Sequence, residues 1–283
     1  MHLLPPGRTT VHWLAALTLL VLARTALADL ALYPTRIVLE KNQRAAQVEL
    51  MNNGTEPETY RINLVNRRMG ETGEFIAIDT PGPGEHFADP LLRYSPRQVT
   101  VQPGTSQTVR ILLRKPADLA PGEYRSHLQF DRVAEAAGTS SVESAGQAGN
   151  KEIGVVIKAL VGASIPVIVR HGDTQASVAL QNLALQPATA TEGPALTLQM
   201  ARSGNRSVYG DLAVTFTPQG GAPLEVAKAG GVAVYVPNAL RRARMPLQLP
   251  PGTRLAGGSL HLTYRERPEA GAHLLAEATL NLP

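Results

Sequence analysis

The chain has 283 residues, of which 43% are hydrophobic and 18% are charged, and it contains no cysteine. A chain of this length predicts about two domains. Without cysteine, disulfides, thiolate catalysis and cysteine-ligated zinc or iron–sulfur sites are excluded. Glycine (25) and proline (22) together make up about a sixth of the chain, which favours many turns over long helices. The formal charge of +4 is too small to indicate a nucleic-acid-binding protein by itself.

Residues 1–28 have the pattern of a secretory signal peptide. Arg8 precedes an apolar run over 13–23, and Ala26 and Ala28 form the small-residue pattern of a cleavage site. The run is shorter than the ~20 apolar residues of a transmembrane helix, although an N-terminal membrane anchor is the alternative. Cleavage removes two arginines and no acid, which lowers the formal charge from +4 to +2. We therefore expect an exported, nearly neutral protein that is held together by packing alone.

The rest of the chain predicts short β-strands separated by turns. Runs rich in Val, Ile, Leu and Thr alternate with clusters of Gly, Pro, Asn and Asp, and no segment keeps a helical apolar spacing over three turns. The predicted strands are 36–40, 46–51, 59–65, 75–78, 98–101, 108–114, 124–131, 177–185, 196–201, 211–217, 232–236, 243–249, 259–265 and 274–282. Many short strands at this spacing predict an all-β protein built from sandwiches.

Residues 134–150 differ from the rest of the chain, because they are mostly Ala, Gly, Ser, Gln and Glu with one Val and no aromatic residue. Such a segment has too little apolar surface to offset the entropy lost on ordering. An interdomain linker is one interpretation. Because the following residues 153–170 are strongly strand-like, we instead place the loop inside a first domain, 29–170, followed by a second domain, 171–283.

The strand that follows this loop is apolar on both faces. One face carries Val155, Ile157, Ala159 and Val161, and the other carries Val156, Lys158, Leu160 and Gly162. A strand of this kind is normally central and covered on both sides. An edge strand whose apolar row is kept for a partner is the alternative, since proteins retain exposed apolar edges mainly where they are used. The pattern alone favours the covered strand.

The sequence carries no catalytic motif of the serine-hydrolase, zinc-peptidase, phosphate-loop or dinucleotide-binding kinds. The histidines beyond residue 28 stand singly, without the spacing of metal ligands. The densest basic run, 241–244, favours one charged face at a strand edge over a nucleic-acid site. Aromatic residues make up only 4% of the chain, which disfavours a carbohydrate- or peptide-binding pocket. We expect no enzyme, no cofactor, no metal and no nucleic-acid partner.

Four blocks in the first domain, taken in order, resemble the periplasmic pilus and fimbrial assembly chaperones (PapD-like), as a divergent branch. They are the opening 32–40 with 48–54 and 60–62, then 94–110, then 119–126, and finally 165–170. The second domain matches only as a generic immunoglobulin-like sandwich. The resemblance implies two immunoglobulin-like β-sandwich domains set at an angle, and a protein of the periplasm.

The resemblance also implies a function. Such a chaperone binds pilus or fimbrial-type subunits that lack a strand, lends them a strand of its own, and delivers them for assembly at the outer membrane, with an usher as a further partner. The row Val155, Ile157, Ala159 and Val161 falls at the donor positions of the strand 153–169, and the loop 134–150 leads into it. Arg36 matches the family's cleft arginine, which binds the terminal carboxylate of the subunit.

Two positions depart from the family pattern. Pro166 stands where the family has a cleft lysine, and Lys158, eight residues earlier on the same side of the strand, is a poor substitute among the subunit-binding candidates. Arg125 stands where the family has an acid, so we expect the interdomain ion pair to Arg170 to be absent.

The alternative function is a secreted structural or adhesive β-sandwich protein of a surface fibre. Only about seven residues, 29–35, precede the first predicted strand. This is short for the donor extension of a fibre subunit, which favours the chaperone.

Overall fold

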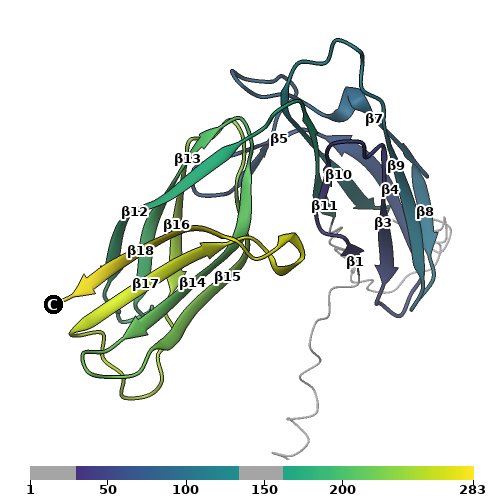
Figure 1. Cartoon of the computed structure of the whole chain (residues 1–283). Helices are drawn as coiled ribbons and strands as arrows, with labels where there is room; N and C mark the ends of the chain where they lie inside the picture. Colours follow the sequence, from purple (N-terminus) through teal and green to yellow (C-terminus); the bar gives the residue numbers. More distant parts are fainter. Residues whose placement is uncertain (1–29, 134–161) are drawn as a thin grey trace, which may run out of the picture.

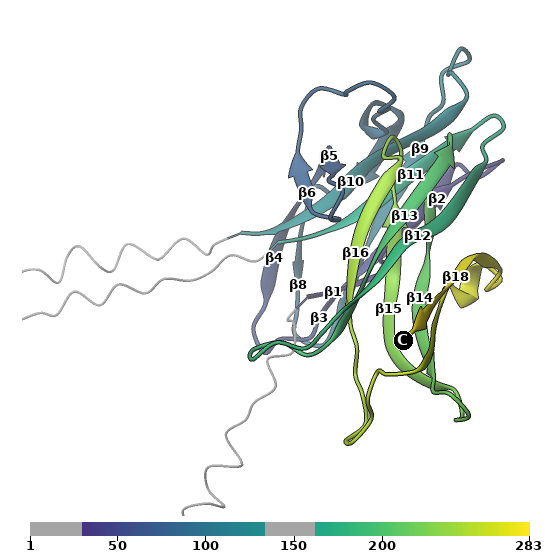
Figure 2. The same cartoon turned by 90° about the vertical axis from the view of Figure 1, so that its left-hand side faces the viewer.

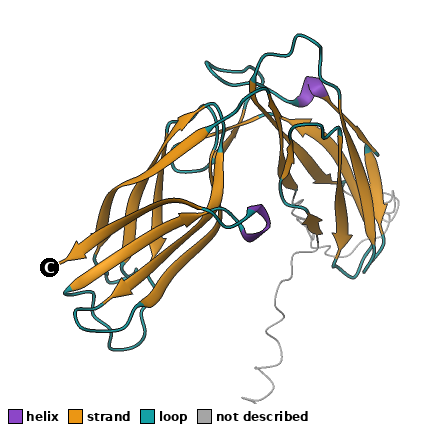
Figure 3. Ribbon diagram, in the orientation of Figure 1, coloured by secondary structure: helices purple, strands orange, loops and turns teal. Residues whose placement is uncertain are grey.

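The computed structural model describes residues 30–133 and 162–283, and their regular structure is almost entirely β-strand (Figures 1, 2 and 3). The strands form two sandwiches, so the predicted all-β fold with two immunoglobulin-like domains is confirmed. The predicted signal peptide 1–28, the loop 134–150 and the donor positions 155–161 lie outside the described residues. Within the described ranges, no helix has the length and hydropathy needed to cross a membrane.

The first sandwich packs a four-stranded sheet against a five-stranded sheet. The four-stranded sheet has the order β1 (Leu30–Tyr33), β3 (Ala45–Asn52), β9 (Ser106–Leu113), β7 (Leu92–Ser95). The five-stranded sheet has the order β2 (Ile37–Leu39), β11 (Ala163–His171), β10 (Gly122–Arg132), β4 (Glu58–Val65), β8 (Gln98–Val101). With β1, β3, β9 and β7 as strands A, B, E and D, and β4, β10 and β11 as C, F and G, this is the immunoglobulin arrangement.

Alternating side chains build the core of this sandwich. On β3, Val48 and Leu50 are fully buried while the residues between them are exposed, as their spacing predicts. The hydroxyl of Tyr124, at the start of β10, donates a hydrogen bond of 2.9 Å to the carbonyl of Ala120. This is the tyrosine corner of immunoglobulin-like domains, and it fixes the turn that leads into strand F.

Two strands of the first sandwich are divided between its sheets. The first strand pairs with β3 as β1 and with β11 as β2, with a cis peptide bond at Tyr33–Pro34 between the halves. β7 and β8 divide in the same way around the cis bond Ser95–Pro96. The sequence pattern predicted β2 and β8 but missed the other halves, β1 and β7. Leu30–Tyr33, which precede the first predicted strand, are therefore part of the sandwich as β1.

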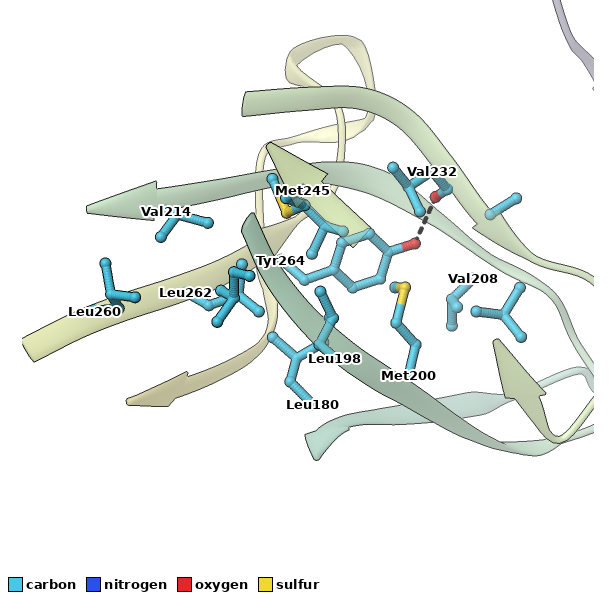
Figure 4. Packing of buried hydrophobic residues seen from close by; sticks show 14 of the residues in the cluster. Leu180, Leu198, Met200, Val208, Val214, Val232, Met245, Leu260, Leu262 and Tyr264 are labelled. Carbon is cyan, nitrogen blue, oxygen red and sulfur yellow. Dashed lines mark hydrogen bonds between the residues drawn. The ribbon is translucent and has the colours of Figure 1, made fainter. Parts of the chain in front are cut away.

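The second sandwich packs a three-stranded sheet against a four-stranded one. The orders are β12 (Ala176–Gln186), β13 (Ala195–Gly204), β16 (Leu240–Pro246), and β15 (Leu224–Val234), β14 (Val208–Thr217), β17 (Gly258–Arg265), β18 (Leu274–Leu282). Figure 4 shows Tyr264 inside this core, where its hydroxyl donates a hydrogen bond of 2.8 Å to the carbonyl of Val232. Burial raises the pKa of Tyr264, so the hydroxyl stays a donor at neutral pH. Residues 172–175 join the two sandwiches.

A small hairpin, β5 (Arg67–Met69) and β6 (Phe75–Ala77), extends from the first sandwich to the second. The side chain of Met69 packs into the core of the second sandwich. The Nδ2 of Asn238 donates a hydrogen bond of 2.7 Å to the carbonyl of Met69. The hairpin therefore contacts both domains, since Met69 packs into the second while the ring of Phe75 contacts His127 of the first. The sequence pattern predicted β6 but missed β5.

Candidate functional site

One face of the five-stranded sheet in the first sandwich is turned toward the second domain. Along β10, Tyr124, Leu128 and Phe130 enter the core of the first sandwich, so the intervening residues lie on the opposite face. On β11, Ile168 is fully buried and packs with the core of the second domain. The two sandwiches therefore meet on this face, and we refer to it as the interdomain face.

Arg36 directly precedes β2 and shares the interdomain face with Val38 by strand alternation. Its Nη1 donates a hydrogen bond of 2.9 Å to the hydroxyl of Tyr235, and its guanidinium carbon lies 4.4 Å from the ring centroid of Tyr209. Both tyrosines belong to the second domain, and this geometry is that of a cation–π contact. No carboxylate of the described residues forms an ion pair with Arg36. The guanidinium is thus held in place while its charge is left uncompensated.

Arg125 brings a second guanidinium to the same tyrosine. Its central carbon lies 4.2 Å from the ring centroid of Tyr235, and its Nη2 donates a hydrogen bond of 3.0 Å to the carbonyl of Arg67. Its Nη1 is buried without a hydrogen-bond partner. Burial lowers the pKa of Arg125, which reflects the free-energy cost of holding this charge away from water. Neither guanidinium forms an ion pair in the described chain, although the carboxylates of Glu123 and Glu85 oppose part of the lowering of the Arg125 pKa. Two cations next to one ring favour the binding of an anion between the domains.

His127 lies beside Arg125 on the interdomain face and is only 2% exposed. Neither ring nitrogen has a hydrogen-bond partner, and the ring of Phe75 contacts it edge-on at 5.1 Å between centroids. Burial, together with the charges of Arg125 and Arg67, lowers the pKa of His127 to about 3. His127 is therefore uncharged at neutral pH and adds no third cation to this face.

Pro166 lies directly opposite His127 in the pairing of β10 with β11. The position of the missing lysine is thus beside the buried cluster of Arg125 and His127. A second cation near Arg36 is Arg125 of β10, since both guanidinium groups lie near the ring of Tyr235. Sequence reasoning treated Arg125 only as the loss of an acid. Arg125 lies two residues before His127 and therefore on the same strand face, and this spacing could have identified it as a cation of the interdomain face.

Arg170 does form an ion pair with an acid of β10, although the arginine at position 125 predicted none, but both ion-pair partners of Arg170 belong to the first domain. The Nε of Arg170 is 3.1 Å from Oε2 of Glu123, and its Nη1 is 3.1 Å from Oε2 of Glu40. Glu123 also accepts hydrogen bonds from the backbone N–H (3.1 Å) and the hydroxyl of Ser207 in the second domain. The acid therefore stands two residues earlier than the resemblance suggested, on the same strand face as Arg125, and it links both domains.

The edge of β11 is open at its described beginning. β10 pairs with β11 from Ala163 onward, whereas β2 pairs with the other edge only over Val167–Val169. Over 163–166, no described strand covers that other edge. The predicted subunit-binding residues Val155, Ile157, Lys158, Ala159 and Val161 lie outside the described residues, so the structure brings none of them to Arg36. They remain predictions, as does the role of Arg36.

The groups on the interdomain face are guanidinium cations, tyrosine rings, an uncharged histidine and the buried carboxylate of Glu123. Cations held beside aromatic rings on such a face can bind an anionic group. In the described part of the chain, no cluster of three His, Asp or Glu residues could hold a metal ion.

No protein-family model and no curated protein matches the chain. Among solved structures, it is similar to the CsuC–CsuE chaperone–tip adhesion subunit pre-assembly complex from the archaic Csu pili of Acinetobacter baumannii, with 11% identity, a TM-score of 0.44, and coverage of 90% of this chain and 98% of that one. It is also similar to a chain of the complex of the Salmonella enterica SafA pilin with the SafB chaperone, with 14% identity, a TM-score of 0.41, and coverage of 92% of this chain and 99% of that one. A third similar structure is the E. coli chaperone DraB, with 13% identity, a TM-score of 0.40, and coverage of 89% of this chain and 98% of that one.

Proposed function

We propose that this protein is a periplasmic chaperone that binds and stabilises pilus or fimbrial-type subunits by donor-strand complementation. The observation that carries the proposal is Arg36, which two tyrosines of the second domain hold in place while its charge has no ion-pair partner in the described chain. The resemblance of residues 29–170 to the pilus chaperones supplies the class of partner. Delivery to an outer-membrane usher and the absence of catalysis and cofactor belong to the same proposal.

The terminal carboxylate of the subunit binds Arg36 in this proposal. A guanidinium can bind a carboxylate through two parallel charge-assisted hydrogen bonds, each contributing about 1.5–3 kcal/mol. Arg125 supplies the second positive charge, since the position of the family's lysine is taken by Pro166. This assignment gives a binding role to the buried Arg125, which forms no ion pair in the described chain.

A strand of the subunit adds to the open edge of β11 in this proposal. Main-chain hydrogen bonds along such an edge give affinity, while alternate side chains give specificity. The open edge begins in the described residues 163–166, close in register to the start of β2 and hence to Arg36. By the sequence pattern, the apolar row Val155, Ile157, Ala159 and Val161 continues it as the donated strand.

The fibre-subunit alternative is less well supported. A fibre subunit needs a leading segment that it can donate to a neighbour. Here Leu30–Tyr33 form β1 and pair with β3 of their own sandwich over four residues. This segment is part of the fold.

Periplasmic co-expression of the tagged protein with a small β-rich subunit from the neighbouring locus tests the proposal. We expect a complex near one-to-one with the wild-type protein, and about tenfold less complex with Arg36→Ala. The matched control is Arg110→Ala, an exposed arginine on the outer face of β9, which should behave as wild type.

Two results would count against the proposal. A complex that survives Arg36→Ala unchanged would move the carboxylate anchor away from Arg36. Failure of the wild-type protein to bind any such subunit would overturn the chaperone function itself. The variant Arg125→Leu should weaken the complex as well, whereas Arg125→Lys should retain part of it.

A further inference from the structure

The second sandwich has an unfilled gap between two strand edges. β16 pairs only with β13, and β15 pairs only with β14, so each leaves one edge without a neighbouring strand in the described chain. A hollow of about 560 Å³ lies between them, with apolar residues Leu198, Leu212 and Met245 in its lining. We call this hollow, bounded by 229–232 of β15 and 241–245 of β16, the β15–β16 slot. Figure 4 shows Met245 and Leu198 beside Tyr264 in the core beneath it.

Both ends of the slot are closed by hydrogen bonds between its walls. At one end, Nη1 of Arg241 donates a bond of 2.5 Å to the carbonyl of Ala233. At the other end, the N–H of Gln248 donates a bond of 2.7 Å to the carbonyl of Val226. The slot is therefore closed at both ends, and its length corresponds to a few residues of an extended chain.

The backbone of β16 offers hydrogen-bonding groups along the slot. The N–H of Arg242 donates a bond of 2.6 Å to the carbonyl of Glu71 in the β5–β6 connection, so it points away from β13. Because backbone direction repeats every two residues in a strand, the N–H and carbonyl of Arg244 point the same way. An open edge of this kind is a template for an added strand.

Three arginines, Arg241, Arg242 and Arg244, lie along the β16 wall of the slot. Arg242 and Arg244 are exposed and form ion pairs with Glu71 and Glu192. Arg241 has no ion-pair partner in the described chain, and its Nε is buried without a hydrogen bond. An apolar lining with arginines along one wall fits a ligand that alternates apolar and acidic groups.

Glu71 already shows how such a residue binds this edge. Its carbonyl accepts the N–H of Arg242, and its carboxylate pairs with the Arg242 guanidinium at 3.1 Å. One acidic residue is thus seated on β16 as an added strand would be. The next outward-facing position, Arg244, has no such backbone partner.

We propose that the β15–β16 slot binds an extended acidic peptide segment, which adds to the free edge of β16. Its acidic side chains pair with the arginines, and its alternate apolar side chains enter the hollow over Leu198 and Met245. This site is formed mainly by the second domain, with Thr72 of the β5–β6 connection also in its lining, and it does not depend on Arg36 or on the proposed chaperone function.

The test uses a fluorescent peptide in which Glu and Val alternate, acetylated and amidated so that no terminal carboxylate can reach Arg36. Fluorescence anisotropy on the full-length protein should show binding. The same peptide with Lys in place of Glu should bind at least about tenfold more weakly. Arg244→Pro removes the outward N–H at an edge position where proline is tolerated, and it should weaken binding of the acidic peptide by about tenfold.

Two control variants keep the test decisive. Arg254→Ser, an exposed arginine in the turn after β16, should bind as wild type, and so should Arg36→Ala. Arg244→Glu keeps the N–H and reverses the charge, so it should weaken binding of the acidic peptide even if Arg244→Pro fails to fold. Equal binding of the acidic and basic peptides, or unchanged binding by both Arg244 variants, would overturn the proposal.

Discussion

Tyr235 is the residue on which the arrangement of the interdomain face depends. Its hydroxyl accepts the hydrogen bond of Arg36, and its ring contacts the guanidinium of Arg125. The partners Arg36 and Tyr235 are 199 residues apart in the chain, and no sequence pattern relates them. Arg36 could be predicted from the resemblance of its surroundings. The tyrosines that hold it could not, since they act through the packing of the second domain.

Removal of the Tyr235 hydroxyl should separate its hydrogen bond with Arg36 from the contact of its ring with Arg125. We expect Tyr235→Phe to lower the free energy of unfolding by about 1.5–3 kcal/mol, the value of one hydrogen bond to a charged group. Tyr235→Leu should lower it further, by about 1–2 kcal/mol more, since the cation–π contacts are also lost. Urea denaturation measures both values. Tyr33→Phe, at a tyrosine that is 77% exposed, is the control and should have no effect. Equal losses for Phe and Leu would show that the ring contributes nothing.

His127 should make the stability of the protein fall in mild acid. Its pKa is about 3 in the folded protein, because burial and the neighbouring arginines oppose protonation, and about 6.5 in the unfolded chain. Below pH 6.5 the unfolded chain takes up a proton that the folded protein does not. The free energy of unfolding should therefore decrease by up to about 1.4 kcal/mol per pH unit as the pH falls from 6.5 toward 3.

Between pH 6.5 and 5 most carboxylates stay ionised, so they contribute little to the dependence of the free energy of unfolding on pH. Denaturation of His127→Gln over this window should show a flatter dependence on pH than the wild-type protein. His261→Gln is the control, because His261 is a surface residue that pairs with Glu277 at 3.1 Å. An unchanged slope in His127→Gln would mean that His127 is protonated in the folded state.

At the scale of elements, alternation predicted the strands that bury one face over many residues. β3, with Val48 and Leu50 buried, is such a strand, and the predicted 46–51 lies within it. β5 was missed because Arg67-Arg68-Met69 shows no alternation of apolar and polar residues. The strand forms through contacts with residues that are distant in the sequence. Arg68 makes an ion pair with Glu85, and Met69 packs into the other domain. Elements whose burial depends on a distant domain leave no local pattern.

The β5–β6 hairpin should therefore affect the second domain more than the first. Met69 is 2% exposed and belongs to the core of the second sandwich. We expect Met69→Ala to cost about 2–5 kcal/mol, the range for large-to-small core substitutions. Hydrogen exchange measured by mass spectrometry should rise in peptides covering β15 and β16.

A neighbouring residue on the same hairpin provides the control. Ile76 is 57% exposed, so Ile76→Ala should change neither stability nor exchange appreciably. If Met69→Ala raised exchange only in strands of the first sandwich, the hairpin would act within its own domain, contrary to this expectation.

At the scale of the whole molecule, buried side chains of the first sandwich pack into the second or form hydrogen bonds with it. Ile168 and Met69 of the first domain enter the core of the second. Glu123 joins Arg170 to Ser207 across the boundary, with its own side chain only 1% exposed. A buried carboxylate that holds partners from two domains makes the folding of each depend on the other. We therefore expect the wild-type protein to unfold in a single cooperative transition.

Substitution of Glu123 should break this dependence. Glu123→Ala leaves Arg170 with only Glu40 and leaves the buried N–H and hydroxyl of Ser207 without this acceptor. Removal of one partner from a buried ion pair costs about 3–5 kcal/mol. Scanning calorimetry should then show two transitions in place of one.

Two further variants distinguish the charge of Glu123 from its hydrogen bonds to the second domain. Ser207→Ala keeps the backbone N–H bond to Glu123 and removes only the hydroxyl, so it should lower the unfolding temperature less than Glu123→Ala. Glu49→Gln, on the exposed outer face of β3, is the matched control for loss of a carboxylate and should unfold as wild type. A single transition at an unchanged temperature in Glu123→Ala would show that apolar packing alone couples the domains. The link through Glu123 would then orient the two sandwiches without stabilising them.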